Sequence, residues 1–479
     1  MSPSARTRLG VPLILLVAGV TTALVSTAGQ DSREPRDLAN HHAHADAGLD
    51  SRNVAGLKPA WKIGTETYVT HRPLIEDGRV YFADWGGRVY AADLRSGKIL
   101  WARDVETPLK ERPWHGFAGT GALGDGLLFE ASAEGNAFAL DVRTGELRWK
   151  VRLAPGEPTA GNAGPLLYHE GLVYAGLCSA EELIQEKGFR PAFRGAVIAL
   201  DAKTGKTAWT LRLAEPPANG VAVWGGFALD ADTRTLFFTT GNNYTGAATD
   251  LADAVVAVDG RAGKVRWKRQ ITENDVWTMT DPKGPDYDFG TGPQLFEVQR
   301  NGTSLRLVGA GQKSGVYVAL DRETGTPVWQ AAVGYGELAG GILADASVAD
   351  GRVLVWSNNS FNPYTRKPGD CPMSVKALDA ATGATLWALP KPQPAGVTAA
   401  GFLSKDVYFV PSLDGQIRAY RAGDGRLLWM SPEEDASIGA SIAAGGGVLC
   451  AGRGVPEMFG GKGKTGHGVW AYAPVTGSR

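Results

Sequence analysis

The sequence predicts an all-β protein that folds as an eight-bladed β-propeller, a ring of four-stranded sheets. Eight of its 14 tryptophans recur at intervals of 40–62 residues, from Trp61 to Trp429. Seven of them end copies of one pattern, such as ALDVRTGELRW at 139–149 and ALDRETGTPVW at 319–329. Repeats of this length with strand-like chemistry are typical of propeller blades.

The two ends of the chain share one further copy of the repeat. Trp61 lies in LKPAW with no copy of the pattern before it, whereas VWAYAP at 469–474 has the first half of the pattern and no tryptophan at its end. A closed ring requires such a division. We therefore expect the N-terminal strand to complete the blade that the C-terminal segment begins.

Each repeat alternates apolar and polar residues in short runs that Asp-Gly, Gly-Gly and Ser/Thr-Gly pairs interrupt. In the Asp-x-x-Thr-Gly turn, the aspartate can accept hydrogen bonds from backbone N–H groups, and the glycine can take the positive φ that the turn requires. The tryptophans are expected to pack between neighbouring blades. They specify the ring, so function must lie elsewhere.

Composition excludes some functions and favours a single large domain. The length of 479 residues could hold three domains, but the unbroken repeat favours one propeller, over 56–479. The net charge is −1, with 49 basic and 50 acidic residues, and gives no indication of a nucleic-acid partner.

The N-terminus has the composition of a secretory signal peptide. Arg6 and Arg8 precede an apolar stretch from Val11 to Val25, and small residues follow up to Ala28. We predict that residues 1–28 are removed on export, to the periplasm, the cell surface or the medium, and that the protein has no stable membrane insertion. An uncleaved membrane anchor is the alternative, although the stretch is short for a spanning helix.

Residues 29–55 form a polar lead-in, in which His41, His42 and His44 could bind a metal but are better explained as part of a solvated segment. The three cysteines, Cys178, Cys371 and Cys450, are isolated, and their pairing is left open. No Cys-x-x-Cys-His motif is present, so no c-type haem is attached covalently.

Several phrases resemble one family. NVAGLKPAW, TTGNNYTG at 239–246, PDYDFGTGP at 285–293 and VGAGQKSGVYVALDRETG at 308–325 are similar to the quinoprotein alcohol dehydrogenases that use pyrroloquinoline quinone (PQQ). They point to the polyvinyl-alcohol-dehydrogenase-like branch. The resemblance covers roughly residues 38–475 and implies oxidation of an alcohol by hydride transfer to the quinone, beside a metal ion and a carboxylate base.

The resemblance also implies a metal site made of oxygen ligands. Glu181 or Glu182 matches the glutamate ligand, Asn242 matches the amide ligand, and Asp286 matches the carboxylate that lies beside the metal and acts as the base. Asp288, two residues further on, is similar to an aspartate that accompanies lanthanide use in some relatives, and it is the alternative base. Calcium is the expected ion, with a lanthanide as the alternative.

The cofactor site follows from the same resemblance. Trp224 matches the residue on which the quinone stacks, and an indole face offers a large flat contact. Lys313, in GQKSG, matches the basic residue that donates to the quinone oxygens and stabilises their negative charge. Asn358 or Asn359 would add a hydrogen bond.

The sequence also departs from the family pattern. It has no adjacent pair of cysteines, and Thr70 stands where methanol-type members have a glutamate. Arg72, His71 and Arg112 lie nearby and could bind the carboxylates of the cofactor instead. His115 could face the mouth of the tunnel, although a structural role fits it better.

The sequence therefore predicts an exported PQQ-dependent alcohol dehydrogenase. Its substrate would be a small or polymeric alcohol, with a secondary hydroxyl expected. Its electrons would pass to a separate acceptor such as a cytochrome or a quinone. The alternative is a non-catalytic or degenerate propeller that acts as a binding or assembly scaffold.

Overall fold

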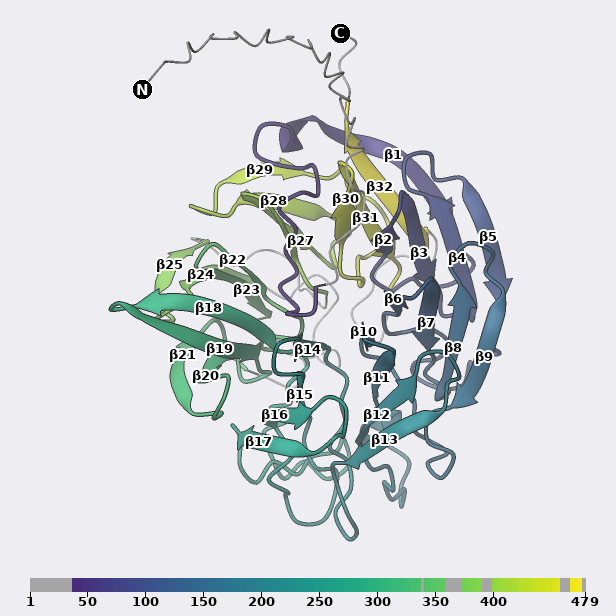
Figure 1. The fold of residues 1–479 in the computed structure, drawn as a ribbon, viewed down its shortest axis with the longest axis vertical. Helices are drawn as coiled ribbons and strands as arrows, with labels where there is room; N and C mark the ends of the chain where they lie inside the picture. The colour runs from purple at the N-terminus through teal and green to yellow at the C-terminus, as the bar shows by residue number, and fades with distance from the viewer. Residues whose placement is uncertain (1–36, 337–339, 359–372, 390–398, 457–465, 476–479) are drawn as a thin grey trace, which may run out of the picture. The chain divides into compact units, whose positions relative to one another are not determined.

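The computed structural model of the protein describes residues 37–336, 340–358, 373–389, 399–456 and 466–475. All of them belong to one compact unit, residues 32–479. Its strands form eight antiparallel sheets of four strands each, arranged around a common centre (Figure 1). The predicted all-β, eight-bladed propeller is confirmed. The predicted signal peptide, Asn359 and Cys371 lie outside the described residues.

Seven of the blades are continuous in sequence, and each runs from an inner to an outer strand. The first three consist of β2 (Leu74–Glu76), β3 (Arg79–Ala83), β4 (Arg88–Asp93) and β5 (Ile99–Asp104); β6 (Ala122–Gly124), β7 (Leu127–Ala131), β8 (Asn136–Asp141) and β9 (Leu147–Arg152); and β10 (Leu167–His169), β11 (Leu172–Gly176), β12 (Ala196–Asp201) and β13 (Thr207–Arg212). The next two consist of β14 (Phe227–Asp230), β15 (Thr235–Thr239), β16 (Ala254–Asp259) and β17 (Val265–Gln270); and β18 (Gln294–Arg300), β19 (Thr303–Gly311), β20 (Val316–Asp321) and β21 (Pro327–Ala332). The sixth and seventh consist of β22 (Ser347–Ala349), β23 (Arg352–Asn358), β24 (Met373–Asp379) and β25 (Thr385–Ala388); and β26 (Phe402–Ser404), β27 (Val407–Pro411), β28 (Ile417–Arg421) and β29 (Leu427–Met430).

The eighth blade joins the two ends of the described chain. It contains β30 (Ala443–Gly445), β31 (Val448–Arg453) and β32 (Gly468–Pro474), and β1 (Leu57–Gly64) is its outermost strand. The strands β1 and β32 are antiparallel, with Trp61 opposite Ala471. The predicted division of one blade between the two ends of the chain is therefore confirmed, and it closes the ring without a covalent link.

The eight tryptophans of the repeat fasten each blade to the next. Each indole N–H donates to a backbone carbonyl of the following blade, at 2.9–3.2 Å. The pairs are Trp61–Leu94, Trp101–Val142, Trp149–Ala202, Trp209–Gly260, Trp267–Arg322, Trp329–Ala380, Trp387–Ala422 and Trp429–Leu57. The last pair joins the seventh blade to β1 and so completes the circle.

The turn glycine of the repeat is required for this docking. Gly325 has a φ of +69°, which only glycine adopts without strain, and a Cβ atom there would lie 2.5 Å from the ring of Trp267. The turn aspartate fixes the approach to this glycine, as predicted. Asp201 Oδ1, for example, accepts from the backbone N–H of Thr204 at 2.9 Å.

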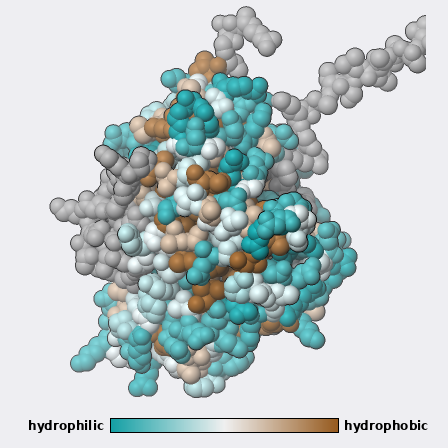
Figure 2. Space-filling view, turned by 90° about the vertical axis from the view of Figure 1, so that its left-hand side faces the viewer, coloured by the Kyte–Doolittle hydropathy of each residue, from teal (hydrophilic) through white to brown (hydrophobic). Residues whose placement is uncertain are grey.

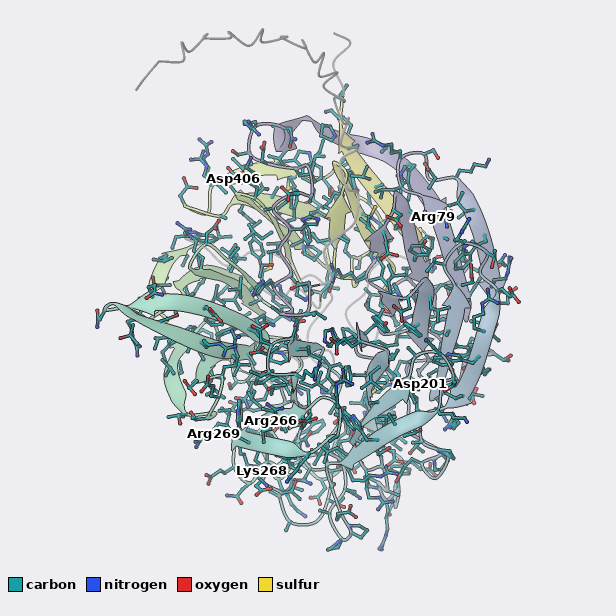
Figure 3. All side chains as sticks on the ribbon, viewed as in Figure 1. Arg79, Asp201, Arg266, Lys268, Arg269 and Asp406 are labelled. Carbon is teal, nitrogen blue, oxygen red and sulfur yellow. The ribbon has the colours of Figure 1, made fainter. Side chains whose placement is uncertain are left out.

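The outer strands carry polar residues between their packed tryptophans. In β17, Arg266 and Lys268 are exposed on either side of Trp267 and lie at the rim of the ring, as does the turn residue Asp201 (Figure 3). One side of the molecule accordingly shows small groups of hydrophobic residues among hydrophilic ones (Figure 2). The rim supports the ring, and the residues singled out for chemistry lie on the inner loops.

The lead-in segment, residues 37–56, is packed against the blades rather than solvated. Its backbone carbonyls accept from N–H groups of β14, β18, β22, β26 and the turn after β30, in that order. The pairs are Leu38–Leu229, Ala39–Leu295, His41–Val348, His42–Leu403 and Ala47–Gly447. The segment ends in the 3₁₀ turn η1 (Val54–Gly56), and it covers inner edges that would otherwise leave N–H groups without acceptors.

The histidines of this segment serve that packing. His42 is 5% exposed and its Nε2 lies 3.0 Å from Asp345 Oδ2, while His41 Nε2 contacts the carbonyl of Leu295. The imidazole of His44 accepts from the backbone N–H of Asp46. The solvated interpretation was wrong for His42 and His44, which are buried, and His41 is half-buried against β18.

Candidate active site

Three neighbouring blades place their loops at one site. The first loop follows β11 and contains the 3₁₀ turn η2 (Ala180–Leu183); the second follows β15, and the third precedes β18. The turn after β19 lies beside the third loop, where the Lys313 N–H donates to the carbonyl of Asp288 at 3.0 Å. The ring geometry therefore brings together residues that are more than 100 positions apart in the sequence.

Asp288 connects the loop of Asn242 with Trp224. Its Oδ1 accepts from the backbone N–H of Asn242 at 3.0 Å, and its Oδ2 accepts from the indole N–H of Trp224 at 3.2 Å. Asp288 and Asn242 are both buried. Both oxygens of Asp288 thus already have donors, which fix its orientation.

The amide of Asn242 has one oxygen available. Its Nδ2 donates to the carbonyls of Asn243 and Trp277, at 2.8 and 2.9 Å. These two bonds fix the rotation of the side chain, and the opposite atom, Oδ1, is buried without a hydrogen-bond partner among the described residues. A buried carbonyl oxygen without a donor is costly unless a cation or a donor completes it.

Lys313 and Asp286 form a buried ion pair. Lys313 Nζ lies 2.6 Å from Asp286 Oδ1, and the two side chains are 9% and 3% exposed. Burial raises the pKa of Asp286 well above its ordinary value, and the positive charge of Lys313 opposes that rise. Burial alone would lower the pKa of Lys313, but the carboxylates of Asp286, Asp288 and Glu182 outweigh it and raise that pKa. The lysine is therefore charged.

The two adjacent glutamates face different surroundings. Glu181 is buried, and its Oε2 accepts from the backbone N–H groups of Ala192 and Phe193, at 2.7 and 2.9 Å. It holds the loop that leads into β12. Glu182 lies near the acidic residues instead: burial first, and then the charges of Asp288 and Asp286, raise its pKa well above the ordinary value.

A further aspartate, Asp275, was not singled out from the sequence. It is fully buried, and its two oxygens accept from the backbone N–H groups of Asp286 and Tyr287, at 3.2 and 2.7 Å. Burial raises its pKa, and the bond from the Tyr287 N–H opposes that rise. Nothing in the repeat marks this residue, because it lies in an insertion between two blades.

Asp253 is a second acidic residue that the sequence reasoning missed. It is fully buried, neither oxygen has a hydrogen-bond partner among the described residues, and burial followed by the charge of Asp288 raises its pKa well above the ordinary value. A sequence signal existed. Asp253 stands before AVVAVD, where five other repeats have glycine, at 87, 135, 195, 315 and 415, and its φ is +49°.

Trp224 lies between the acidic loops and a cavity along the axis. Its ring is half-buried, and a Cβ atom at Gly290 would lie 2.3 Å from it. The cavity, of about 300 Å³, is lined by Trp224 and extends to Asn40 and His42 of the lead-in segment. The carboxylates of the site do not line it.

The remaining candidates lie apart from the acidic loops. The Arg112 guanidinium donates to the carbonyls of Ala133 and Pro158, at 3.3 and 3.2 Å, and no described contact joins it to Asp286 or Lys313. Asn358 is buried and pairs through its backbone with Gly341, whose Cβ position would lie 2.0 Å from the Lys313 carbonyl. Asn358 therefore supports the backbone of the lysine turn.

The residues near Thr70 have local roles. Thr70 Oγ1 accepts from the indole N–H of Trp85 at 2.8 Å. His71 is fully buried, with its Nε2 2.9 Å from Glu130 Oε1, so its ring is not directed at a ligand. Arg72 lines the axial cavity. His115 packs on the edge of Trp85, with ring centroids 5.3 Å apart.

The site could bind a hard cation, which prefers oxygen ligands, only if the side-chain amide oxygen of Asn242 is one of the ligands. Across the described ranges, no three histidine, cysteine or carboxylate side chains are close enough to bind a metal by themselves. The unsatisfied Asn242 Oδ1, with Glu182 and Asp288 nearby, supplies the kind of hard oxygen donors that calcium and lanthanides prefer. The half-buried face of Trp224 offers a flat apolar surface beside them.

Comparisons with known proteins show what the whole chain is similar to. Residues 193–333 match the family described as "Glucose/ethanol/alcohol dehydrogenase, beta-propeller domain", and residues 371–479 match "Outer membrane protein assembly factor BamB". The chain is 27% identical over 442 residues to a polyvinylalcohol dehydrogenase of Pseudomonas sp, covering 85% of this chain and 68% of the relative. It is 26% identical over 424 residues to that of Sphingopyxis sp. (strain 113P3), covering 80% and 64%. The chain thus spans about two thirds of the length of these relatives.

A solved structure shows the same fold. The quinohemoprotein alcohol dehydrogenase from Comamonas testosteroni superposes with a TM-score of 0.75 at 19% identity, over 95% of this chain and 82% of that one. These matches support a place for the chain in the PQQ-dependent quinoprotein alcohol dehydrogenase family. Within that family, the two polyvinylalcohol dehydrogenases support the predicted polyvinyl-alcohol-dehydrogenase-like branch. The predicted enzyme class, a PQQ-dependent alcohol dehydrogenase, agrees with these matches.

No helix in the described parts of the chain has both the length and the apolar character needed to cross a membrane.

Proposed function

We propose that the protein oxidises an alcohol with PQQ and a metal ion bound beside Trp224, and that its electrons leave through a separate carrier. The observation that carries this proposal is the convergence of Glu182, Asn242, Asp286 and Lys313 from three blades onto one buried site. When bound, PQQ supplies a two-electron acceptor and the metal supplies Lewis acidity.

The metal would be held by Glu182, Asn242 and Asp288. The proposal rests on the buried, unsatisfied Asn242 Oδ1 and on the mutual repulsion of the carboxylates, which a cation relieves. Glu181 is left out of the ligand set because its Oε2 accepts from two backbone N–H groups of the loop that leads into β12, whereas Asp288 contacts the loop of Asn242 directly. Calcium is the expected ion, and a lanthanide is the alternative that the assay includes.

Asp286 would accept the hydroxyl proton of the alcohol. A general base must be ionised, and in this buried position the ammonium of Lys313 at 2.6 Å supports the ionised form. Lys313 would also donate to the cofactor oxygens on which negative charge develops. Asp288 is a poorer base, because both its oxygens already accept hydrogen bonds and its position is fixed.

The substrate and the cellular context follow from the relatives. The two polyvinylalcohol dehydrogenases bear names that imply a polymeric secondary alcohol, and this motivates a secondary hydroxyl, small or polymeric, for this chain. Export through the N-terminal segment and a cytochrome or quinone as electron acceptor complete the proposal.

The assay is dye reduction by purified protein incubated with PQQ and Ca²⁺ or a lanthanide, with a panel of primary and secondary alcohols. Turnover that requires both PQQ and metal, and that Asp286→Asn abolishes, would support the proposal. No reduction with any alcohol would favour a scaffold, for which the match over residues 371–479 to an outer-membrane assembly factor is the motivation. That stretch contains none of the site residues, whereas residues 193–333 contain five of them, Trp224, Asn242, Asp286, Asp288 and Lys313.

A further inference from the structure

The backbone at Asp286 adopts an unusual conformation. Its φ is +61°, in the left-handed region, where a residue with a side chain is less stable than in ordinary conformations by about 1–2 kcal/mol. Such a conformation persists only where neighbouring contacts stabilise it, and these contacts are often found at functional sites. The contact that stabilises this conformation of Asp286 is therefore a candidate for a functional role.

That contact is the carboxylate of Asp275. Its Oδ1 accepts from the Asp286 N–H at 3.2 Å and its Oδ2 accepts from the Tyr287 N–H at 2.7 Å. Two consecutive N–H groups that converge in this way form a concave anion site. The bonds to ionised oxygen are stronger than ordinary hydrogen bonds, so Asp275 can offset the strain at Asp286.

The same residue is bound to the loop of Asn242. The carbonyl of Asp275 accepts from the backbone N–H of Asn243 at 3.3 Å, and Trp277, two residues on, donates its N–H to the Asn243 carbonyl at 2.9 Å. The Trp277 carbonyl accepts from Asn242 Nδ2. The segment 275–277 thus links the two loops that carry Asn242 and Asp286.

We infer that Asp275 is a positioning residue for the base: its carboxylate holds the backbone of Asp286 so that the side chain meets Lys313 and the substrate in register with Asn242. The inference rests on the proposed function, in which Asp286 is the base. Asp275 itself touches no reacting atom in this account.

Two variants disturb this contact in different ways. Asp275→Asn replaces one accepting oxygen by an NH₂ group, which cannot accept from an N–H. Gly284→Ala keeps the charge of Asp275 but displaces it, because a Cβ atom at Gly284 would lie 1.9 Å from Asp275 Oδ1. Asp275→Asn leaves the backbone link from Asp275 to Asn243 in place, whereas the new Cβ atom in Gly284→Ala would also lie 2.8 Å from the Cα of Asp275 and from the backbone N of Val276.

Two controls match these variants. Asp253→Asn removes a carboxylate from the same acidic surroundings without touching the N–H groups of Asp286 and Tyr287. Gly156→Ala adds a methyl group at a loop glycine that has no atom within 4 Å of the new Cβ position. The first control tests the loss of a neighbouring acidic side chain, and the second tests the general effect of alanine.

The measurements use the holoenzyme reconstituted with PQQ and Ca²⁺. For both test variants we expect kcat to fall about 100-fold, the loss that misplacing a catalytic group by about 1 Å produces. KM for the alcohol should change less than threefold. Hydrogen exchange of the peptide that covers residues 284–288 should speed up at least tenfold. The affinity for Tb³⁺ should change less than threefold, as measured by Tb³⁺ emission that nearby tryptophan sensitises.

The controls should show none of these changes beyond threefold. Faster exchange at 284–288 with kcat unchanged would overturn the inference, because the contact would then be merely structural. An equal loss of kcat in Asp253→Asn would also overturn it, since the loss of any neighbouring acidic side chain would then explain the effect. If the unsubstituted protein does not turn over, the proposed function fails and this inference fails with it. If the unsubstituted protein turns over and both test variants retain its full rate, the proposed function stands and only this inference fails.

Discussion

The pair formed by Lys313 and Asp286 gives the sharpest prediction. Methionine at position 313 preserves most of the length of the side chain but removes its charge. Neither oxygen of Asp286 has a hydrogen-bond partner among the described residues apart from this ion-pair contact. In Lys313→Met, the buried carboxylate therefore loses the charge that favours its ionised form, and its pKa should rise.

The size of the rise follows from the distance. At 2.6 Å and an effective dielectric constant of about 20, the attraction is about 6 kcal/mol. Since about 1.4 kcal/mol corresponds to one pKa unit, this sets an upper limit of about four to five units. The bound metal and relaxation of the loop absorb part of it, so we expect the pKa that governs kcat to rise by about two units.

The assay is kcat as a function of pH for the reconstituted enzyme. Below the acid limb of the parent protein, Lys313→Met should turn over about 100-fold more slowly, since one pKa unit is tenfold in the ionised fraction, and the rate should recover at alkaline pH. Lys313→Arg retains the charge and should leave the limb in place. A constant loss at every pH, with the limb unmoved, would refute the reasoning and leave Lys313 with a role on the quinone alone.

Three further predictions concern the metal and the ring. Glu182→Gln should weaken Ca²⁺ binding at least tenfold by calorimetry, whereas Glu181→Gln should lower the melting temperature and leave the affinity within about twofold, because its carboxylate holds backbone N–H groups. Burial raises the pKa values of Glu182, Asp253 and Asp286, so these three groups bind more protons in the folded apo-protein than in the unfolded chain. Above about pH 6, carboxylates with lowered pKa values, such as Asp50 and Glu106, are ionised in both states, so the melting temperature should fall as pH rises further through neutrality, and added metal should reverse that fall. A metal-induced rise in melting temperature that is larger at pH 5 than at pH 8 would contradict this. Trp329→Phe removes an indole N–H that donates to the carbonyl of Ala380 in the next blade at 3.0 Å, and should lower the free energy of unfolding in urea by about 1–3 kcal/mol. An unchanged urea midpoint would contradict the inference that these tryptophans stabilise the contacts between blades.

Much of the architecture could be predicted because the repeat encodes it directly. The turn aspartate, the turn glycine and the tryptophan recur at fixed offsets, and each offset corresponds to one contact between blades. Closure by β1 followed from the same pattern, because half a repeat stood at each end of the chain.

The site was less accessible from the sequence. Spacing favoured Glu182 only slightly over Glu181, because both lie in one short turn. Only the orientation of that turn directs one of them inward and the other towards backbone N–H groups. Asp275 was missed because its partners are backbone N–H groups, which carry no sequence signature. Asp253 could have been found by aligning the repeats, since it replaces a glycine.

For the lead-in segment, a polar composition led to a wrong prediction of solvent exposure. A polar stretch with three histidines was expected to be solvated, yet His42 and Asp345 are both buried and bonded to each other. Its hydrogen bonds to inner strands compensate the polar groups, and the strands that provide these donors are more than 180 residues away in the chain.

The most direct test of the whole account is a calorimetric titration of the apo-protein with PQQ, with and without Ca²⁺. We expect one PQQ per chain when the metal is present, and at least tenfold weaker binding without metal or when Trp224 is replaced by alanine. Saturating PQQ that gives no heat of binding under either condition, with a folded protein, would contradict the claim that these loops form a quinone site.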